Sequence, residues 1–510
     1  MMIEGDNSIK TTPENKELSG YRGIFKATAL FGGVQFWKIL IMIVQTKFVA
    51  LLLGPTGVGI KGLYTSATSL IQSISSLGIA NSAVRDVSQA NGSGDAKRVG
   101  HVIAVLRKLV WITGLLGMFA VIALSPVLSK TTFEDNSHII PFVILSITLL
   151  FSQLTAGNNV LLQGTRKLTY LAKAGIFGSI ICLFVTVPFY YFWGQDGIVP
   201  ALVLDSLLLY FVSCYYSNKV SIKKASVSLK ETTHEGKEIV GLGLVMTYNS
   251  ILVYGASYFL RIFINRDYDG GITDVGLYNA GFAVMNTYVG LIFTAMTTDY
   301  YPRLAAVNSD DEKCREIINQ QIEVSLLILG PLMLFFIPLA PLAVIAIYSN
   351  QFLPIVGFMQ WAALGMCFKA ISWGISYLFI AKGDKKVFAI NETIINLAAL
   401  VMNIMGYSLW GLTGLGIAYC LNCFLYAIIV YLMAKSKYGF SFYSEVRIIN
   451  SIMMLCLVSV FLLLRMWDGW WTYIPSSIII IAGCLYALRE LNKRMNIRDY
   501  LVRLKSRKAL

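Results

Sequence analysis

Two stretches of the chain match each other and set its architecture: WGQDGIVPALVLDSLLLY, which begins at Trp193, and WGLTGLGIAYCLNCFLYA, which begins at Trp410. At one constant offset they share Trp-Gly, a second glycine, an alanine and a leucine, and Asp205 stands opposite Asn422. Apolar helices can resemble each other by chance, but the shared Trp-Gly-x-x-Gly at the same place in each half favours a true repeat. A repeat defines architecture, so the sequence predicts two related halves.

The composition is that of an integral membrane protein. Hydrophobic residues make up 56% of the 510 residues and charged residues 14%, whereas soluble domains hold about 25% charged residues. A span needs roughly 17 to 25 apolar residues. Runs of that length predict an all-α membrane protein with about fourteen transmembrane helices, at 28–53, 57–84, 109–128, 138–162, 170–193, 197–217, 239–264, 275–297, 322–347, 352–380, 386–408, 411–434, 448–466 and 470–488.

The repeat divides these spans into two lobes of about six helices each, followed by two further spans. An even number of spans per half means that both halves enter the membrane from the same side, related by a pseudo-two-fold axis along the membrane normal. The predicted segments are a cytoplasmic N-terminal segment 1–27, an N-lobe 28–218, a cytoplasmic inter-lobe loop 219–238, a C-lobe 239–435, two C-terminal spans in 436–488 and a basic cytoplasmic tail 489–510.

The formal net charge of +14 follows from this topology. Most of the 42 Lys and Arg residues fall in segments that are cytoplasmic when both termini lie inside, as the positive-inside rule requires. Basic cytoplasmic tails are common in membrane proteins, so we expect no nucleic-acid partner. The first 27 residues lack the apolar core of a signal peptide, and the first span is expected to direct insertion.

The cysteines predict packing, not chemistry. The eight cysteines lie almost all within apolar runs, and only Cys420 and Cys423 have CxxC spacing, in mid-helix and without a second pair or a histidine nearby. We therefore expect neither disulfides nor a metal site.

Ionisable side chains at membrane depth are functional candidates, since each costs several kcal/mol unless it faces a cavity or a partner. Gln35, Lys38 and Gln45 share one face of the first span by their spacing. This face is polar enough to contact water or a ligand. Lys47 and Lys61 lie toward the predicted outer end, where they either serve the substrate or extend to the interface.

The seventh predicted span offers hydroxyls, rings and a cation on one face, including Tyr254, Tyr258 and Arg261. Such a set suits sugars and a diphosphate, although Arg261 is near enough to the span's end to act as an interfacial anchor instead. Lys369 lies deeper, without an acidic neighbour in its own helix. The sequence predicts that Lys38, Arg261 and Lys369 together receive an anionic diphosphate.

Acidic candidates are fewer. Asp205 and Glu392 are possible sites for proton or sodium coupling, since buried carboxylates can titrate near physiological pH. Asp205 can equally neutralise a cavity lysine, and Glu392 can lie at headgroup level. Glu323, at the start of its span, is expected among the headgroups.

Two stretches resemble the polysaccharide-exporting flippases of the multidrug/oligosaccharidyl-lipid/polysaccharide (MOP) superfamily, often called Wzx or O-antigen translocases. They are FVALLLGPTGVGIKGLYTSATSLIQSISSLGIANSAVRD, from Phe48 to Asp86, and LLQGTRKLTYLAKAGIFGSII, from Leu161 to Ile181. The resemblance implies a V-shaped pair of six-helix lobes around a cationic cavity, alternating access, and an undecaprenyl-diphosphate-linked oligosaccharide of O-antigen, capsule or exopolysaccharide synthesis as substrate. It also implies a bacterial cytoplasmic membrane location, contact with membrane lipids, and a polysaccharide polymerase and chain-length regulator as partners. No cofactor is expected beyond a coupling proton or sodium ion.

Three classes of function compete. An enzyme is disfavoured, because His101, His138 and His234 are scattered and the chain has no HExxH, GxSxG or phosphate-binding loop. A MATE-like exporter of cationic small molecules calls for an acidic cavity, whereas the membrane-embedded basic residues here outnumber the acidic ones. That balance favours an anionic lipid-linked substrate, and a lipid II flippase, with the peptidoglycan precursor as substrate, is the closest alternative.

Overall fold

The computed structural model describes residues 13–93, 95–222, 225, 227, 229–267, 269–467 and 469–495. These described residues form helices and the turns between them, with no β-strand. Ten helical stretches are long and apolar enough to cross a membrane. Three of the ten contain a sharp break, at Gly54, Gly194 and Gly411. The chain is therefore the all-α, multi-pass membrane protein that the composition predicts, and the figure of about fourteen spans stays a prediction.

The elements follow one another with short connections. The first half contains α1 (Pro13–Ser75), α2 (Ile79–Gly92), α3 (Ala96–Phe133), α4 (Ile139–Gly164), α5 (Leu168–Trp193), the 3-10 turn η1 (Gly194–Gly197) and α6 (Ile198–Ser217). The second half contains α7 (Leu229–Asn265), α8 (Gly271–Phe282), the π-helical turn η2 (Ala283–Tyr288), α9 (Gly290–Ala306), α10 (Asp311–Ile347), η3 (Asn350–Ile355), α11 (Val356–Ala381) and α12 (Lys385–Tyr438). The chain ends with α13 (Ser444–Met466), η4 (Trp470–Thr472) and α14 (Tyr473–Met495).

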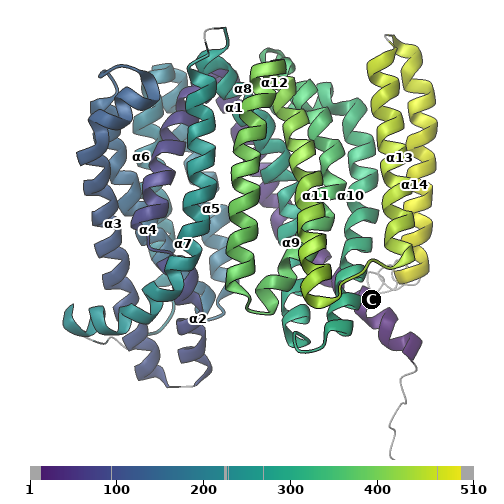
Figure 1. The fold of residues 1–510 in the computed structure, drawn as a ribbon. Coiled ribbons are helices and arrows are strands. Elements are labelled where there is room, and N and C mark those ends of the chain that lie inside the picture. Colours follow the sequence, from purple (N-terminus) through teal and green to yellow (C-terminus); the bar gives the residue numbers. More distant parts are fainter. Residues whose placement is uncertain are drawn as a thin grey trace, which may run out of the picture.

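The sequence repeat is also a backbone repeat. Gly194 has φ 53° and ψ −125°, and Gly411 has φ 56° and ψ −139°. Only glycine adopts such a conformation without strain. Each glycine follows the repeat tryptophan and reverses the chain, so that α5 packs on α6 and the two limbs of α12 lie side by side (Figure 1).

The buried apolar side chains separate into clusters that follow the two halves. One large cluster is built mainly from α8 to α14, and two smaller ones mainly from α1 to α6. Figure 1 shows α2 to α6 toward the left and α9 to α14 toward the right, with α1 running from the lower right to the top of the view between them. α7 contacts α1, α2 and α3 as well as α8 and α12. α1 likewise contacts α8, α9 and α10. The two groups are therefore joined by both α1 and α7.

Several helices extend beyond the predicted spans. α7 begins at Leu229, inside the predicted loop 219–238, because its first residues (LKETTHEGKE) include many good helix formers. α10 begins well before its predicted span, where the Asp310 carboxylate accepts hydrogen bonds from the backbone of Glu312 and Lys313, at 3.1 Å each. The predicted segments 1–27 and 489–510 fall partly outside the described residues, and the lobe boundaries stay predictions.

The last two helices attach to the second half through a buried ion pair. The Arg494 guanidinium on α14 lies 2.6 Å from a Glu323 carboxylate oxygen on α10 and 2.6 Å from one of Glu490. Glu323 is only 4% exposed. The expectation that Glu323 faces headgroups did not anticipate this partner, which lies far along the sequence.

Candidate functional site

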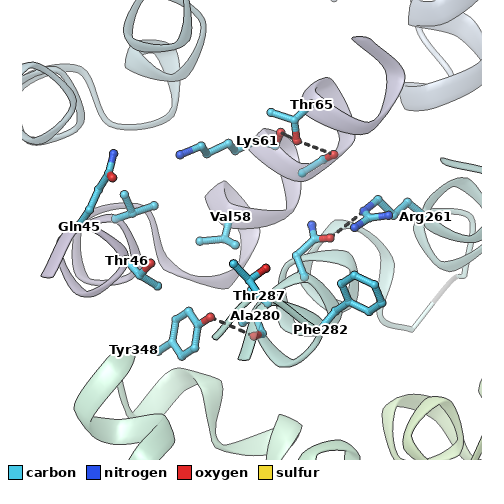
Figure 2. A pocket seen from close by; sticks show the side chains of 14 residues that line it. Gln45, Thr46, Val58, Lys61, Thr65, Arg261, Ala280, Phe282, Thr287 and Tyr348 are labelled. Carbon is cyan, nitrogen blue, oxygen red and sulfur yellow. Dashed lines mark hydrogen bonds between the residues drawn. The ribbon is translucent and has the colours of Figure 1, made fainter. Parts of the chain in front are cut away.

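A cavity of about 410 Å³ lies where the two halves meet (Figure 2). It is bounded by both limbs of α1, by α7 and α8, by the π-helical turn η2 and by the end of α10. Its lining residues are Gln45, Thr46, Val49, Val58, Lys61, Gly62, Thr65, Arg261, Asn279, Ala280, Phe282, Ala283, Thr287 and Tyr348. The cavity thus combines polar and cationic side chains from two groups of helices.

Glycines allow α1 and α8 to approach each other closely beside this cavity. A Cβ atom on Gly276 of α8 would lie 1.8 Å from the carbonyl oxygen of Pro55, and one on Gly59 would lie 2.0 Å from that of Ile272. The second limb of α1 and α8 therefore touch backbone to backbone near the Gly54 turn, at the top of the view in Figure 1. Any side chain at these two positions would separate the helices.

Arg261 forms one cationic wall. Its Nε donates to Asn279 Oδ1 at 2.7 Å, and one Nη donates to the backbone carbonyl of Ser257 at 2.8 Å and to the Ser257 hydroxyl. The Tyr278 ring centroid lies 5.6 Å from the guanidinium carbon. No carboxylate pairs with Arg261 among the described residues, so neutral acceptors hold its positive charge at the cavity.

Lys61 forms the opposite wall. In Figure 2 the side chains of Lys61 and Gln45 extend away from Arg261. The Lys61 ammonium lies 5.8 Å from the Tyr190 ring centroid and interacts electrostatically with Asp205. Lys61 lines the cavity, and the alternative role of an interfacial anchor stays a prediction. The missed signal was the pairing of Lys61 with Thr65, four residues on, on one face of α1.

Lys47 does not line the cavity. Its ammonium donates to the backbone carbonyls of Ile345 and Tyr348, at 2.6 Å each. These carbonyls belong to the C-terminal end of α10, where the helix leaves acceptors unpaired and carries partial negative charge. Lys47 therefore ties the first limb of α1 to α10.

Lys369 is held inside the second half. Its ammonium donates to Asn286 Oδ1 at 2.6 Å and to the Tyr419 hydroxyl at 2.9 Å. It is not one of the residues that line the central cavity. The link runs through Asn286 in the π-helical turn, so Lys369 contacts the cavity wall from behind.

Of the other predicted site residues that the structure describes, some line the cavity and some do not. Gln45 lines the cavity, whereas Tyr254 is 45% exposed and away from it. Tyr258 is buried against α3, with its hydroxyl 2.7 Å from that of Thr132. The spacing rule placed these tyrosines on the face of Arg261, but α7 packs on different helices along its length. The side chains of Gln35 and Lys38 lie outside the described part of the structure.

The two candidate coupling carboxylates have similar surroundings. Asp205 accepts hydrogen bonds from the Thr186 hydroxyl, at 2.9 and 3.1 Å. Glu392 accepts one from the Tyr426 hydroxyl at 2.8 Å. The partner of Asp205 is on the neighbouring helix α5, and the partner of Glu392 is on the other limb of α12. Of the two carboxylates, only Asp205 interacts electrostatically with a cation of the cavity. Within the described ranges, no group of three His, Cys, Asp or Glu could hold a metal ion.

The bundle and its cavity are those of a multi-pass membrane transport protein. A family model described as "Polysaccharide biosynthesis protein" matches residues 48–357, and the chain belongs to this family. No curated protein matches the chain.

Solved structures share the fold. An inward-facing multidrug resistance MATE family transporter of the MOP superfamily has a TM-score of 0.64 and 14% identity, over 78% of this chain and 94% of that one. The lipid II flippase MurJ, in an inward closed conformation, has a TM-score of 0.64 and 14% identity, over 91% and 99%. A MOP superfamily transporter from Pyrococcus furiosus has a TM-score of 0.60 and 15% identity, over 84% and 99%. The predicted MOP superfamily membership is confirmed, and family and fold are those of transporters and flippases.

Proposed function

We propose that this protein is a flippase that moves a polyprenyl-diphosphate-linked oligosaccharide from the inner to the outer leaflet of the bacterial cytoplasmic membrane. Both termini lie in the cytoplasm in this proposal, and alternating access of the two halves carries the ligand. The observation that supports it best is Arg261, a cation at the central cavity that is held by neutral acceptors alone.

An anionic headgroup fits this arrangement. A diphosphate that leaves water for a low-dielectric cavity loses hydration worth many kcal/mol, and charge-assisted hydrogen bonds offset that loss. Lys61 and Arg261 stand on opposite walls and come from different halves of the chain. One ligand that contacts both would draw the halves together, which is how binding can favour one state of a transporter. Lys38 stays a predicted third cation, and Lys369 acts by positioning Asn286.

Complementation of polysaccharide export tests this function. Arg261→Ala should reduce surface polysaccharide at least about tenfold, because charge-assisted hydrogen bonds are worth roughly 1.5–3 kcal/mol each. Arg261→Lys should retain more export, since it keeps the charge and loses the fork. Arg266→Ala is the matched control: Arg266 directly follows the end of α7, is exposed, and pairs with Glu134 at 3.3 Å. Full export by an Arg261→Ala, Lys61→Ala double variant at normal membrane level would refute the proposal.

Impermeant thiol labelling tests the orientation. A cysteine in the 54–56 turn should react from outside the cell, and a cysteine in the 219–238 loop should react only after the membrane is opened. Labelling of the loop in intact cells would reverse the proposed direction of transport.

Ion coupling is the second part of the proposal. We assign it to Asp205, with a proton or sodium ion as the coupling species, because Asp205 interacts electrostatically with the cavity residue Lys61. A ligand phosphate near Lys61 would compete with Asp205 for that cation. Glu392 is the second candidate, and its neighbours among the described residues are neutral.

A further inference from the structure

A second cavity, also of about 410 Å³, lies between α9 and α11, away from the cationic one. Its lining includes Phe293, Thr294, Thr297, Tyr301, Trp373 and Tyr377. Four of these six side chains are aromatic, and five of the six, all except Phe293, carry a hydroxyl or an indole N–H. Among its described lining residues none is charged, so its chemistry differs from that of the site around Lys61 and Arg261.

The rings form a continuous wall. The centroid of Trp373 lies 5.2 Å from that of Phe293 and 5.6 Å from that of Tyr377, and Tyr301 lies 5.9 Å from Tyr377. These separations fall in the range of favourable aromatic pairs. The wall is thus fixed before any ligand arrives, which lowers the entropic cost of binding.

Hydroxyl oxygens lie beside the rings. The Thr294 hydroxyl donates to the carbonyl of Gly290 at 3.1 Å, and that of Thr297 donates to the carbonyl of Phe293 at 2.8 Å. Each oxygen keeps lone pairs that can accept a hydrogen bond. Flat rings next to neutral hydroxyls suit a saccharide, which presents C–H faces and hydroxyl groups, and do not suit a phosphate, which needs donors and cations.

Polar side chains that line the two cavities follow one another along the rod formed by η2 and α9, and we call them the polar stripe. Thr287 lines the central cavity, and Thr294, Thr297 and Tyr301 follow it by 7, 10 and 14 residues, close to one face of the same helical rod. At about 1.5 Å per residue, the stripe extends about 10 to 20 Å from Thr287. One ligand with an anionic end and a sugar chain can therefore reach both cavities at once.

We propose that the cavity between α9 and α11 binds the oligosaccharide part of the ligand while its diphosphate occupies the central cavity. This inference rests on the proposed flippase function and adds where the sugar is recognised. Trp373 supplies the main stacking face, and the hydroxyls of Tyr301 and Tyr377 contact sugar hydroxyls.

Two probes separate this role from other uses of the cavity. The first is polyprenyl diphosphate without sugar, and the second is glycosylated polyprenyl diphosphate extracted from the native host. Binding of both to the purified full-length protein in lipid nanodiscs gives two dissociation constants. Wild-type protein should bind the glycosylated probe more tightly. Trp373→Leu should weaken binding of that probe roughly tenfold and change binding of the bare diphosphate by less than about twofold.

Trp361→Leu is the matched control, because Trp361 lies on the same helix but packs on Phe461 of α13, with ring centroids 4.6 Å apart. It should change neither constant. Tyr377→Phe removes only a hydroxyl and should weaken binding of the glycosylated probe about threefold. This variant serves as the test if Trp373→Leu folds poorly.

If Trp373→Leu weakened binding of both probes equally, the cavity would hold the lipid tail. If binding of both probes were unchanged, the cavity would hold neither part of the ligand. Either result would overturn this inference and leave the proposed flippase function standing. Arg261→Ala should weaken the binding of both probes. Failure of the wild-type protein to bind either probe would overturn the proposed function together with this inference.

Discussion

The two repeats have the same turn and different chemistry. Gly194 and Gly411 reverse the chain with nearly the same backbone angles. Beyond each turn, at matching positions, stand Asp205 and Asn422. Asp205 accepts hydrogen bonds from Thr186 and interacts with Lys61, whereas the Asn422 side-chain oxygen is buried and has no hydrogen-bond partner among the described atoms.

This difference shows that the helix pair and its charge depend on different residues. The turn depends on a glycine that no other residue replaces without strain. The residue a few turns later can vary, because it only needs surroundings that match its charge. The first half supplies such surroundings for a carboxylate at this position, through Thr186 and Lys61. At the matching position of the second half, no described group donates to the Asn422 side-chain oxygen.

The largest effect is expected when the second repeat is given the charge of the first. Asn422→Asp should destabilise the protein by about 3 kcal/mol, since a carboxylate within a membrane helix without a partner is costly. Thermal unfolding in detergent and the yield in membranes measure it. Asn422→Ser, which stays neutral, is the control. Wild-type stability for Asn422→Asp would mean that the second half also has a partner for a carboxylate.

The turns themselves should respond alike. Gly194→Ala and Gly411→Ala should each cost about 1–3 kcal/mol, because alanine is strained at their positive φ angles even though neither added Cβ meets a neighbour. Gly175→Ala controls for the substitution itself, since Gly175 is helical and also has open space. A large effect at one turn and none at the other would break the equivalence of the repeats.

Removal of the charge in the first repeat should affect transport more than stability. Asp205→Asn keeps the shape that accepts hydrogen bonds from Thr186, so we expect a change in unfolding free energy below about 1 kcal/mol. Export should lose its dependence on pH or on sodium. Export measured across both variables checks this, and an unchanged dependence would assign coupling elsewhere.

The smallest effect concerns the connection between α3 and α4 in the first half. His138 lies in this connection, and its Nδ1 is 2.5 Å from the hydroxyl of Tyr64 on α1. Burial lowers the pKa of His138. The unfolded chain then binds more protons, so stability is lost as pH falls below about 6.5. We expect a decrease in melting temperature of the order of 1 °C. His138→Gln should remove this pH dependence, and its persistence in that variant would point to another group.

The sequence predicted the helices, the repeat and the superfamily, because those depend on local patterns. Apolar run lengths mark spans, and a glycine after a tryptophan marks each turn. Gln45 and Arg261 were also predicted at the site, since a polar side chain within a span requires a cavity or a partner. The lobe boundaries, the cytoplasmic termini and the roles of Lys38 and Glu392 stay predictions.

The positions of the other cations required the packing between helices. Helical spacing gives the direction of a side chain from its own axis and says nothing about which neighbour it meets. Lys47 meets the end of α10, Lys369 meets Asn286, and Lys61 meets the cavity. The aromatic cavity was missed for the same reason, since Trp373 and Tyr301 come from different helices and form a wall only when α9 and α11 pack together.

The π-helical turn η2 places one extra residue in the rod formed by α8 and α9. A π-turn holds one more residue than the α-helical turn it replaces. If the same residues wound as a regular α-helix, everything after Tyr288 would rotate by about 100° about the helix axis. Thr294, Thr297 and Tyr301 would then point toward different neighbours, whereas the cavity residues Asn279 and Ala280, which precede the turn, would stay in place. Rewinding of a single turn would thus act as a rotary joint, able to connect the central cavity with the aromatic one or to disconnect it.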